Sequence, residues 1–131
     1  MVDTGLHVVL DTSAVIEVIQ GTSLGKQVER HIGTRIVTFP AIVVAEACAI
    51  AQREGRDAEL LFRLLLSEAH VVHIDSKLAY HASILYALTK KKKPKFSLAD
   101  AIVVMTGDQC NAPVITCDND FAGMKNVTVV R

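Results

Sequence analysis

The sequence has no excess of charge of either sign, because 14 Lys and Arg residues balance 14 Asp and Glu residues. A neutral chain has no overall field that would attract nucleic acid, so local charge must hold any anionic ligand. The chain also lacks an apolar run near the roughly 18 residues that a membrane span requires. Its N-terminus lacks the basic-then-apolar pattern of a signal peptide. The sequence therefore predicts no membrane association.

The sequence has few cysteines, and their spacing forms no recognised pair. Cys48, Cys110 and Cys117 are an odd number of thiols, and no two of them form a C-x-x-C motif. This pattern favours reduced thiols in a cytoplasmic protein. A disulfide between Cys110 and Cys117 is the alternative that the spacing leaves open.

The composition indicates a globular protein, since 50% of the 131 residues are hydrophobic and 21% are charged. The length suits a single domain over residues 1–131 with a core of its own. The mean hydropathy of +0.34 is high for so small a chain. We therefore expect part of the apolar surface to lie in a subunit interface.

Short apolar runs alternate with longer helical patterns along the whole chain. Strands are predicted at residues 6–11, 35–39, 71–75, 113–117 and 127–130. Helices are predicted at residues 12–21, 23–33, 40–54, 57–69, 76–90 and 97–109, with Ser23 as the N-cap of the second. The alternation predicts an α/β fold with a mostly parallel sheet of about five strands and helices on both faces, in three layers.

Acidic residues stand alone in apolar surroundings at four places. Asp11 ends the first predicted strand, and Asp118 and Asp120 follow the fourth. Glu46 and Asp100 lie within predicted helices. Because ligands bind beyond the carboxyl ends of parallel strands, these positions could meet at one end of the sheet.

Most of these acids also have a purely structural explanation. Asp11 could cap the following helix, and Asp100 lies three residues after Ser97, as in a capping box. Asp118 and Asp120 could shape a turn. Glu46 is harder to explain in this way, because it lies in mid-helix with no Lys or Arg three or four residues away. It requires either a tertiary salt bridge or a cation.

If the acids converge, their like charges raise one another's pKa, and no Lys or Arg belongs to any of these motifs. A divalent metal would neutralise them. Oxygen ligands alone favour Mg²⁺ or Mn²⁺ over zinc. An acidic cluster with a hard metal ion is typical of phosphodiester chemistry.

Four motifs in this order resemble the PIN-domain family, and in particular the VapC-type toxin ribonucleases. They are VVLDTSAVIE with Asp11, FPAIVVAEACAI with Glu46, FSLADAIVV with Asp100, and VITCDNDF with Asp118 and Asp120. The resemblance spans nearly the whole chain. It implies a PIN-like fold and a Mg²⁺- or Mn²⁺-dependent endoribonuclease, usually a homodimer, that cleaves RNA with an activated water. In a toxin of this class, a VapB-type antitoxin partner would block the site.

The resemblance also assigns roles to individual residues. Asp11, Glu46 and Asp100 would be the central metal ligands, Asp118 would complete the catalytic site, and Asp120 would contribute more loosely. Thr12, Ser13 and Thr116 match hydroxyl residues that would orient carboxylates or waters. Their alternative explanation is helix capping and strand propensity.

The only dense basic segment is the lysine run at residues 90–95. Lys91, Lys92, Lys93 and Lys95 are predicted to bind RNA phosphates, because the run immediately precedes the helix of Asp100. A solvated loop is the alternative.

Two other functions remain open at this stage. One is a non-catalytic PIN-like module that binds RNA or protein. The other is a phosphoaspartate enzyme, against which Ser13 counts because it stands where a second Asp is expected.

Overall fold

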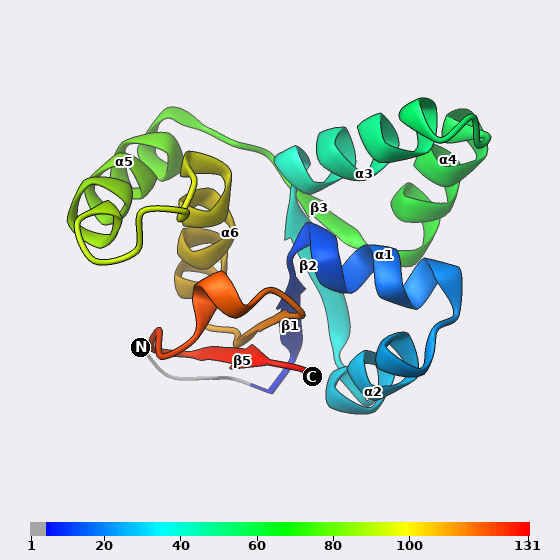
Figure 1. Ribbon diagram of the computed structural model, residues 1–131, viewed down its shortest axis with the longest axis horizontal. Coiled ribbons are helices and arrows are strands. Elements are labelled where there is room, and N and C mark those ends of the chain that lie inside the picture. Colours follow the sequence, from blue (N-terminus) through cyan, green and yellow to red (C-terminus); the bar gives the residue numbers. More distant parts are fainter. Residues whose placement is uncertain (1–4) are drawn as a thin grey trace.

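The computed structural model describes residues 5–131, which contain one five-stranded sheet between two layers of helices (Figure 1). The strands are β1 (His7–Leu10), β2 (Ile36–Pro40), β3 (His70–Val72), β4 (Val114–Thr116) and β5 (Val127–Val129). They lie in the order β3-β2-β1-β4-β5, and every adjacent pair is parallel. The predicted α/β class is confirmed, with a fully rather than mostly parallel sheet. Residues 1–4 of the predicted domain lie outside the described residues.

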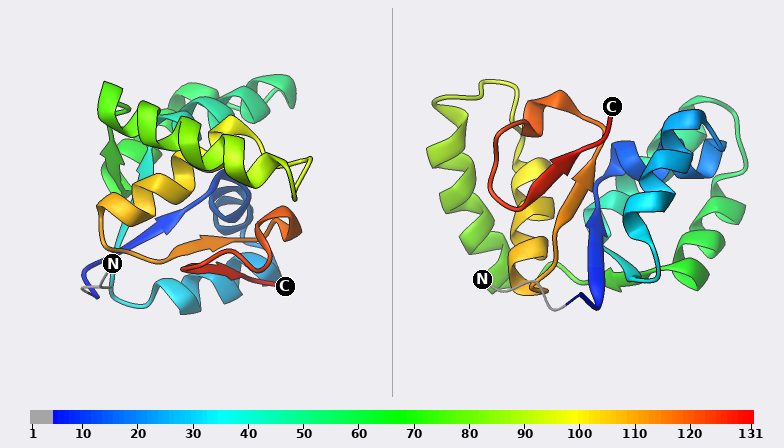
Figure 2. Two further views of the ribbon diagram at one scale, coloured as in Figure 1. Left: turned by 90° about the vertical axis from the view of Figure 1, so that its left-hand side faces the viewer. Right: turned by 90° about the horizontal axis from the view of Figure 1, so that it is seen from below.

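The helices cover both faces of the sheet. They are α1 (Thr12–Gln20), α2 (Ser23–Ile32), α3 (Ala41–Arg53), α4 (Ala58–Glu68), α5 (Ser76–Lys90) and α6 (Leu98–Gln109), with a short 3-10 helix η1 (Asn119–Phe121). Helices α5 and α6 lie on one side and α1 to α4 on the other (Figures 1 and 2). This arrangement confirms the predicted three layers. No helix within residues 5–131 has both the length and the apolar character needed to cross a bilayer.

Short polar side chains start most of the helices, because their oxygens accept hydrogen bonds from backbone N–H groups left unpaired in the first turn. Asp11, Asp57, Asp75 and Ser97 cap α1, α4, α5 and α6 in this way. The predicted cap at Ser23 is wrong. Thr22 caps α2 instead, since its Oγ1 accepts from the Gly25 N–H at 2.9 Å.

The core is centred on β1. Val8, Val9 and Leu10 are at most 2% exposed, as expected for a strand covered on both faces. A second cluster lies under α5 and α6, where the rings of Phe96 and Phe121 meet edge to face with centroids 5.9 Å apart. This cluster joins the loop before α6 to η1.

The sheet extends from β1 on both sides. Strands β2 and β3 add to one side and β4 and β5 to the other, so the strand order reverses between β1 and β4, where Leu10 is paired with Ile115. Ligands bind at the carboxyl ends of the strands at such a reversal. Asp11 directly follows β1, and Asp118 lies two residues after the end of β4, which places both acids at this point.

The three cysteines, Cys48, Cys110 and Cys117, are free thiols. No disulfide joins Cys110 to Cys117 in this structure.

Candidate active site

Asp11 is held in place by three hydrogen bonds at the end of β1. Its Oδ1 accepts from the Ala14 N–H at 3.0 Å and from the Ser13 hydroxyl at 2.8 Å, and its Oδ2 accepts from the Thr116 hydroxyl at 2.8 Å. The side chain is only 5% exposed. Asp11 therefore caps α1, as one explanation of its position predicted, and also presents a buried carboxylate to the end of the sheet.

The two hydroxyl groups that contact Asp11 can each donate a hydrogen bond to only one acceptor. The Ser13 Oγ accepts from the Cys117 N–H and the Thr116 Oγ1 accepts from the Asp118 N–H, both at 3.0 Å. Because a backbone N–H can only donate, each hydroxyl keeps its single proton for Asp11. The 3.3 Å approach of Ser13 to Thr116 then carries no proton. Both residues thus orient the Asp11 carboxylate.

Burial raises the pKa of Asp11 to about 6. The hydrogen bonds from Ala14, Ser13 and Thr116 lower the pKa of this carboxyl group, while the nearby charge of Asp118 raises it. Within residues 5–131 no Lys or Arg forms an ion pair with Asp11. The carboxylate therefore accepts three hydrogen bonds but has no Lys or Arg counter-charge within the described residues.

Glu46 connects α3 to the start of α1. Its Oε1 accepts a 2.6 Å hydrogen bond from the Thr12 hydroxyl, and Thr12 directly follows Asp11. No ion pair to Glu46 exists in the described part of the chain, so the alternative of a tertiary salt bridge is wrong. Thr12 positions the Glu46 carboxylate beside the other acids.

Asp100 has two roles. Its Oδ2 accepts from the Ser97 N–H at 2.9 Å, and its own N–H donates to the Ser97 hydroxyl at 3.0 Å, which completes a capping box. Burial raises the pKa of the Asp100 carboxyl group, and the charges of Asp118 and Glu46 raise it further. The capping explanation is confirmed, and Asp100 also lies within electrostatic reach of two other acids.

Asp118 is the shared neighbour in this group, since its charge raises the pKa values of both Asp11 and Asp100. Its Oδ1 accepts from the Asp120 N–H at 2.8 Å, so Asp118 also shapes the turn into η1, as the turn explanation predicted. The Asp120 carboxylate lines an adjoining pocket with Lys93 and Lys95.

The fold thus brings Asp11, Glu46, Asp100 and Asp118 together at the carboxyl end of the sheet. No three His, Cys, Asp or Glu side chains of residues 5–131 already stand in a geometry that would hold a metal ion. Like charges separate when nothing neutralises them, and each of these four carboxylates accepts a hydrogen bond from a hydroxyl or backbone donor. A set of oxygen donors without counter-charge fits a hard divalent cation.

The lysine run is tethered to the protein at two points. Lys90 Nζ donates to the Phe96 carbonyl at 3.3 Å, and Lys93 Nζ donates to the Ala122 carbonyl at 2.7 Å. The ammonium groups of Lys91, Lys92 and Lys95 have no hydrogen-bond or ion-pair partner among residues 5–131. Lys93 thus holds the loop in place, and the other three lysines are available to an anion.

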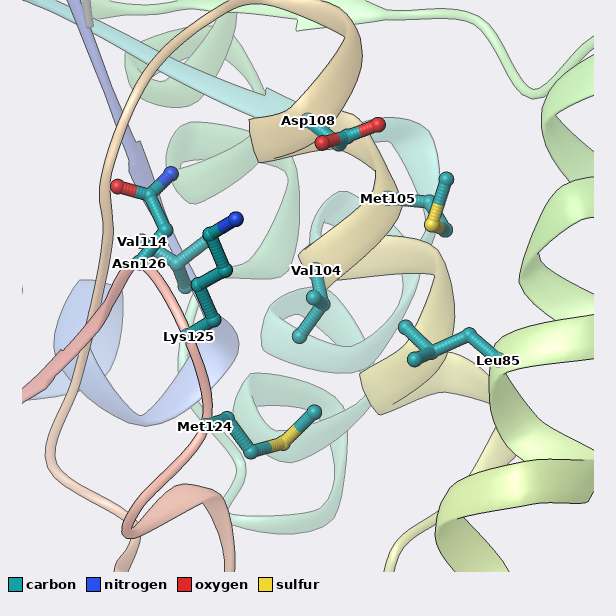
Figure 3. Close-up of a pocket in the computed structure, with 8 residues that line it drawn as sticks. All are labelled: Leu85, Val104, Met105, Asp108, Val114, Met124, Lys125 and Asn126. Atoms are coloured by element: carbon teal, nitrogen blue, oxygen red, sulfur yellow. The ribbon is translucent and has the colours of Figure 1, made fainter. Parts of the chain in front are cut away.

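Another cavity, of about 310 Å³, lies away from the acids and between α5, α6 and the loop before β5 (Figure 3). Its lining is mostly apolar, with Asp108, Lys125 and Asn126 as the polar members. Asn126 precedes β5, so it lies toward the amino ends of the strands. The predicted site residues do not line this cavity.

Two residues beside the site were missed from the sequence. The Asn119 Oδ1 accepts from the Arg131 Nε at 2.8 Å, next to Asp118 and Asp120. Asn119 lies within the fourth acidic motif, which is a signal that could have identified it. Arg131 lies 12 residues away with no motif around it, so only the fold reveals its position.

Comparison with known proteins gives a family and a set of similar folds. The family model described as PIN domain matches residues 8–127. No curated protein sequence matches the chain. A toxin–antitoxin complex from Klebsiella pneumoniae is similar, with a TM-score of 0.72, 23% identity, and coverage of 93% of this chain and 96% of that one.

Two further solved structures share the fold. Mycobacterium tuberculosis VapC20, titled a Sarcin-Ricin loop cleaving toxin, has a TM-score of 0.72 at 18% identity, over 95% of this chain and 99% of that one. The DNA-bound VapBC from Salmonella typhimurium has a TM-score of 0.70 at 15% identity, over 95% and 96%. At these identities the likeness concerns the fold.

Proposed function

Because the chain belongs to the PIN domain family, we propose that it is a metal-dependent endoribonuclease and the toxin of a toxin–antitoxin pair. The observation that carries this proposal is the group Asp11, Glu46, Asp100 and Asp118, which meets at the strand reversal with no ion pair to a Lys or Arg of residues 5–131. Such a group binds a cation more readily than it stays ionised alone.

Asp11, Glu46, Asp100 and Asp118 would hold one or more Mg²⁺ or Mn²⁺ ions, and Asp120 stays a predicted outer contributor. When bound, such an ion polarises a phosphoryl oxygen and activates water for attack on phosphorus. Ser13 and Thr116 keep Asp11 in its orientation, and Thr12 does the same for Glu46. Each acid is thereby positioned before substrate arrives.

The lysine run would bind the RNA backbone beside the acids. Lys91, Lys92 and Lys95 are available for phosphate oxygens, whereas Lys93 holds the loop against Ala122. Contacts of this kind provide affinity that weakens with salt and carries no base preference.

The partner would be a VapB-type antitoxin, since two of the similar structures are titled as VapBC or toxin–antitoxin complexes. A mostly apolar groove of about 420 Å³ between α1, α2, β2 and α4 offers a surface to a partner segment. Exposed apolar residues such as Leu60 (63%) and Leu88 (64%) support the predicted homodimer.

The toxin assignment predicts a short upstream gene that encodes a DNA-binding protein. Suppression of RNA cleavage by the product of that gene tests the assignment. An RNA substrate agrees with a cytoplasmic location.

The second function kept is a non-catalytic module that binds RNA or protein. The buried Asp11, which has no counter-charge in the part of the chain that the structure describes, counts against it, because a binding surface gains nothing from an acid that is costly to ionise.

Cleavage of single-stranded RNA with Mg²⁺ or Mn²⁺, with and without EDTA, tests the proposal. We expect EDTA, Asp11→Asn and Asp100→Asn each to reduce cleavage about a hundredfold or more. Asp108→Asn is the matched control, because it changes an exposed carboxylate beside the distant cavity. Cleavage that survives both chelation and the two substitutions contradicts the assignment.

A further inference from the structure

A pocket of about 360 Å³ lies beside the acidic group, between the lysine run and η1. Its lining residues are Lys93, Pro94, Lys95, Phe96, Asn119 and Asp120. Asp120 is joined to the site directly, since its N–H donates to Asp118 Oδ1 at 2.8 Å. The volume lies within the range of about 300–1,000 Å³ that is typical of ligand pockets.

Both walls of this pocket are fixed before any ligand binds. Lys93 Nζ donates to the Ala122 carbonyl at 2.7 Å, which ties the lysine run to the segment after η1. Beneath this bond, Phe96 and Phe121 are 0% exposed and their rings meet edge to face. The pocket therefore has a defined shape, which is what recognition of a particular group requires.

The lining residues on the two segments differ in chemistry. On the lysine run, Lys95 has an ammonium group with no partner within residues 5–131. On η1, Asp120 has a carboxylate whose oxygens accept no hydrogen bond in the described part of the chain. Beside it, Asn119 Oδ1 is occupied by Arg131 Nε at 2.8 Å, which leaves the amide N–H group to donate. A phosphate suits Lys95, and a group with N–H donors suits Asp120.

We propose that this pocket receives a guanine nucleotide next to the cleaved phosphodiester, with Lys95 on its phosphate and Asp120 on its base. Guanine has two adjacent donors, N1–H and N2–H, on its Watson–Crick edge, and they match the two acceptor oxygens of a carboxylate. No other RNA base has two adjacent donors on that edge, so each would place an acceptor against one of the two Asp120 oxygens. Single-stranded RNA is read on this edge because its bases are unpaired. The proposal rests on the endoribonuclease function above.

In this proposal, Lys95 and Asp120 contribute differently to RNA binding. Lys95 supplies affinity for any sequence, because a phosphate contact does not distinguish bases. Asp120 supplies the choice of base, because a mismatched edge would place two acceptors against each other. If Asp120 acted only on the metal, it would change the turnover of every RNA equally.

The test uses single-stranded RNA oligonucleotides of one length, with Mg²⁺ present, after the cleaved bond has been mapped on a mixed sequence. At each position flanking that bond, guanine is replaced by inosine, which lacks the N2 amino group, or by adenine. For the unmodified protein we expect replacement at one of these positions to lower kcat/KM about tenfold. In Asp120→Asn we expect this discrimination to disappear, and in the matched control Asp108→Asn we expect it to persist.

Binding at several salt concentrations tests the phosphate contact. Lys95→Ala should reduce the slope of log Kd against log salt by about 0.7 without changing the preferred base. Lys125→Ala, at the distant cavity, is the matched control.

Three results overturn the inference. If the unmodified protein cleaves RNA without a guanine preference at any flanking position, the pocket does not read this base. If Asp120→Asn lowers kcat by the same factor for every oligonucleotide, Asp120 acts only on the metal and does not read the base. If the unmodified protein cleaves nothing, the proposed function fails, and this inference fails with it.

Discussion

At the scale of single residues, the site depends on two hydroxyl groups that can donate their proton only to Asp11. Thr116 accepts from the Asp118 N–H and donates to Asp11, so it links two strands' ends to one carboxylate. Ser13 does the same with the Cys117 N–H. Partners of this kind fix the orientation of a ligating group, and their loss weakens metal binding about 10–100-fold.

Thr116→Val should therefore weaken Mn²⁺ binding about 10–100-fold while the fold is kept. Thr106→Val is the matched control: Thr106 is equally buried, at 0% exposed, and its hydroxyl only bonds the Ile102 carbonyl within α6. Titration calorimetry with Mn²⁺ measures both variants. Equal affinities for the two variants would show that the Thr116 hydroxyl does not position Asp11 for a metal.

The pKa of Asp11 predicts how stability depends on pH in the absence of metal. The folded-state pKa of about 6 lies above the ordinary value of 3.8, so the folded protein holds this proton more tightly than the unfolded chain. The resulting stabilisation is complete below about pH 4 and is lost as the pH rises through about 6. For this nearly buried group the loss is about 3 kcal/mol.

Urea unfolding in EDTA should show this fall between about pH 4 and pH 6, together with a smaller change of the same sign from Asp100. Asp11→Asn should remove most of the change, because an amide does not ionise. A slope that is unaltered in Asp11→Asn would assign the pH dependence to other groups.

The sequence identified the candidate acids, but it did not show that one acid could both cap a helix and belong to the site. Helix capping and site formation were treated as competing explanations for Asp11 and Asp100, and the structure combines them. Because a carboxylate has two oxygens, one can accept from a helix terminus while the group still faces other acids. The tertiary salt bridge considered for Glu46 could only be tested in the fold.

At the scale of elements, α1 and α2 approach each other closely at Gly25. Gly25 makes this approach possible: a Cβ at this position would lie 2.1 Å from the Glu17 carbonyl oxygen. This contact is with backbone, so no side-chain rotation can relieve it. Gly25 thus fixes how α2 packs against the helix that carries Thr12 and Ser13.

Gly25→Ala should lower the free energy of unfolding by about 1–3 kcal/mol, as overpacking usually does. Ser23→Ala is the matched control, because Thr22 rather than Ser23 caps the same helix. Thermal and urea unfolding compare the two variants. A Gly25→Ala variant as stable as Ser23→Ala would mean that α1 and α2 separate freely.

Helix positions were predicted to within one or two residues, because Asp, Ser and Gly mark the helix ends through local chemistry. The contact between Lys93 and Ala122, 29 residues apart, had no such local signal. Nor did the contact of Arg131 with Asn119. Long-range contacts of this kind shape the proposed guanine pocket, and only the fold brings them together.

At the scale of the whole molecule, the order of the strands determines where the acids meet. The alternation of strands and helices predicted a parallel sheet, but it did not predict that β1 would lie between β2 and β4. That order places Asp11 and Asp118 at adjacent strand ends. A cation bound there would join segments that are more than 100 residues apart in the chain.

Binding of a cation by the folded state alone should stabilise the whole domain. At a Mn²⁺ concentration about 100 times the Kd, the expected gain is about 2.7 kcal/mol. We expect the thermal midpoint to rise with Mn²⁺ in the unmodified protein and in Asp108→Asn, and to stay constant in Asp11→Asn. A rise of equal size in Asp11→Asn would place the cation elsewhere.

The central claim is that four carboxylates far apart in the chain share a divalent cation. Anomalous scattering from crystals soaked with Mn²⁺ tests it most directly. We expect a peak at the carboxyl end of the sheet, about 2.0–2.3 Å from oxygens of at least two of Asp11, Glu46, Asp100 and Asp118. A saturated crystal with no peak among these four side chains would contradict it.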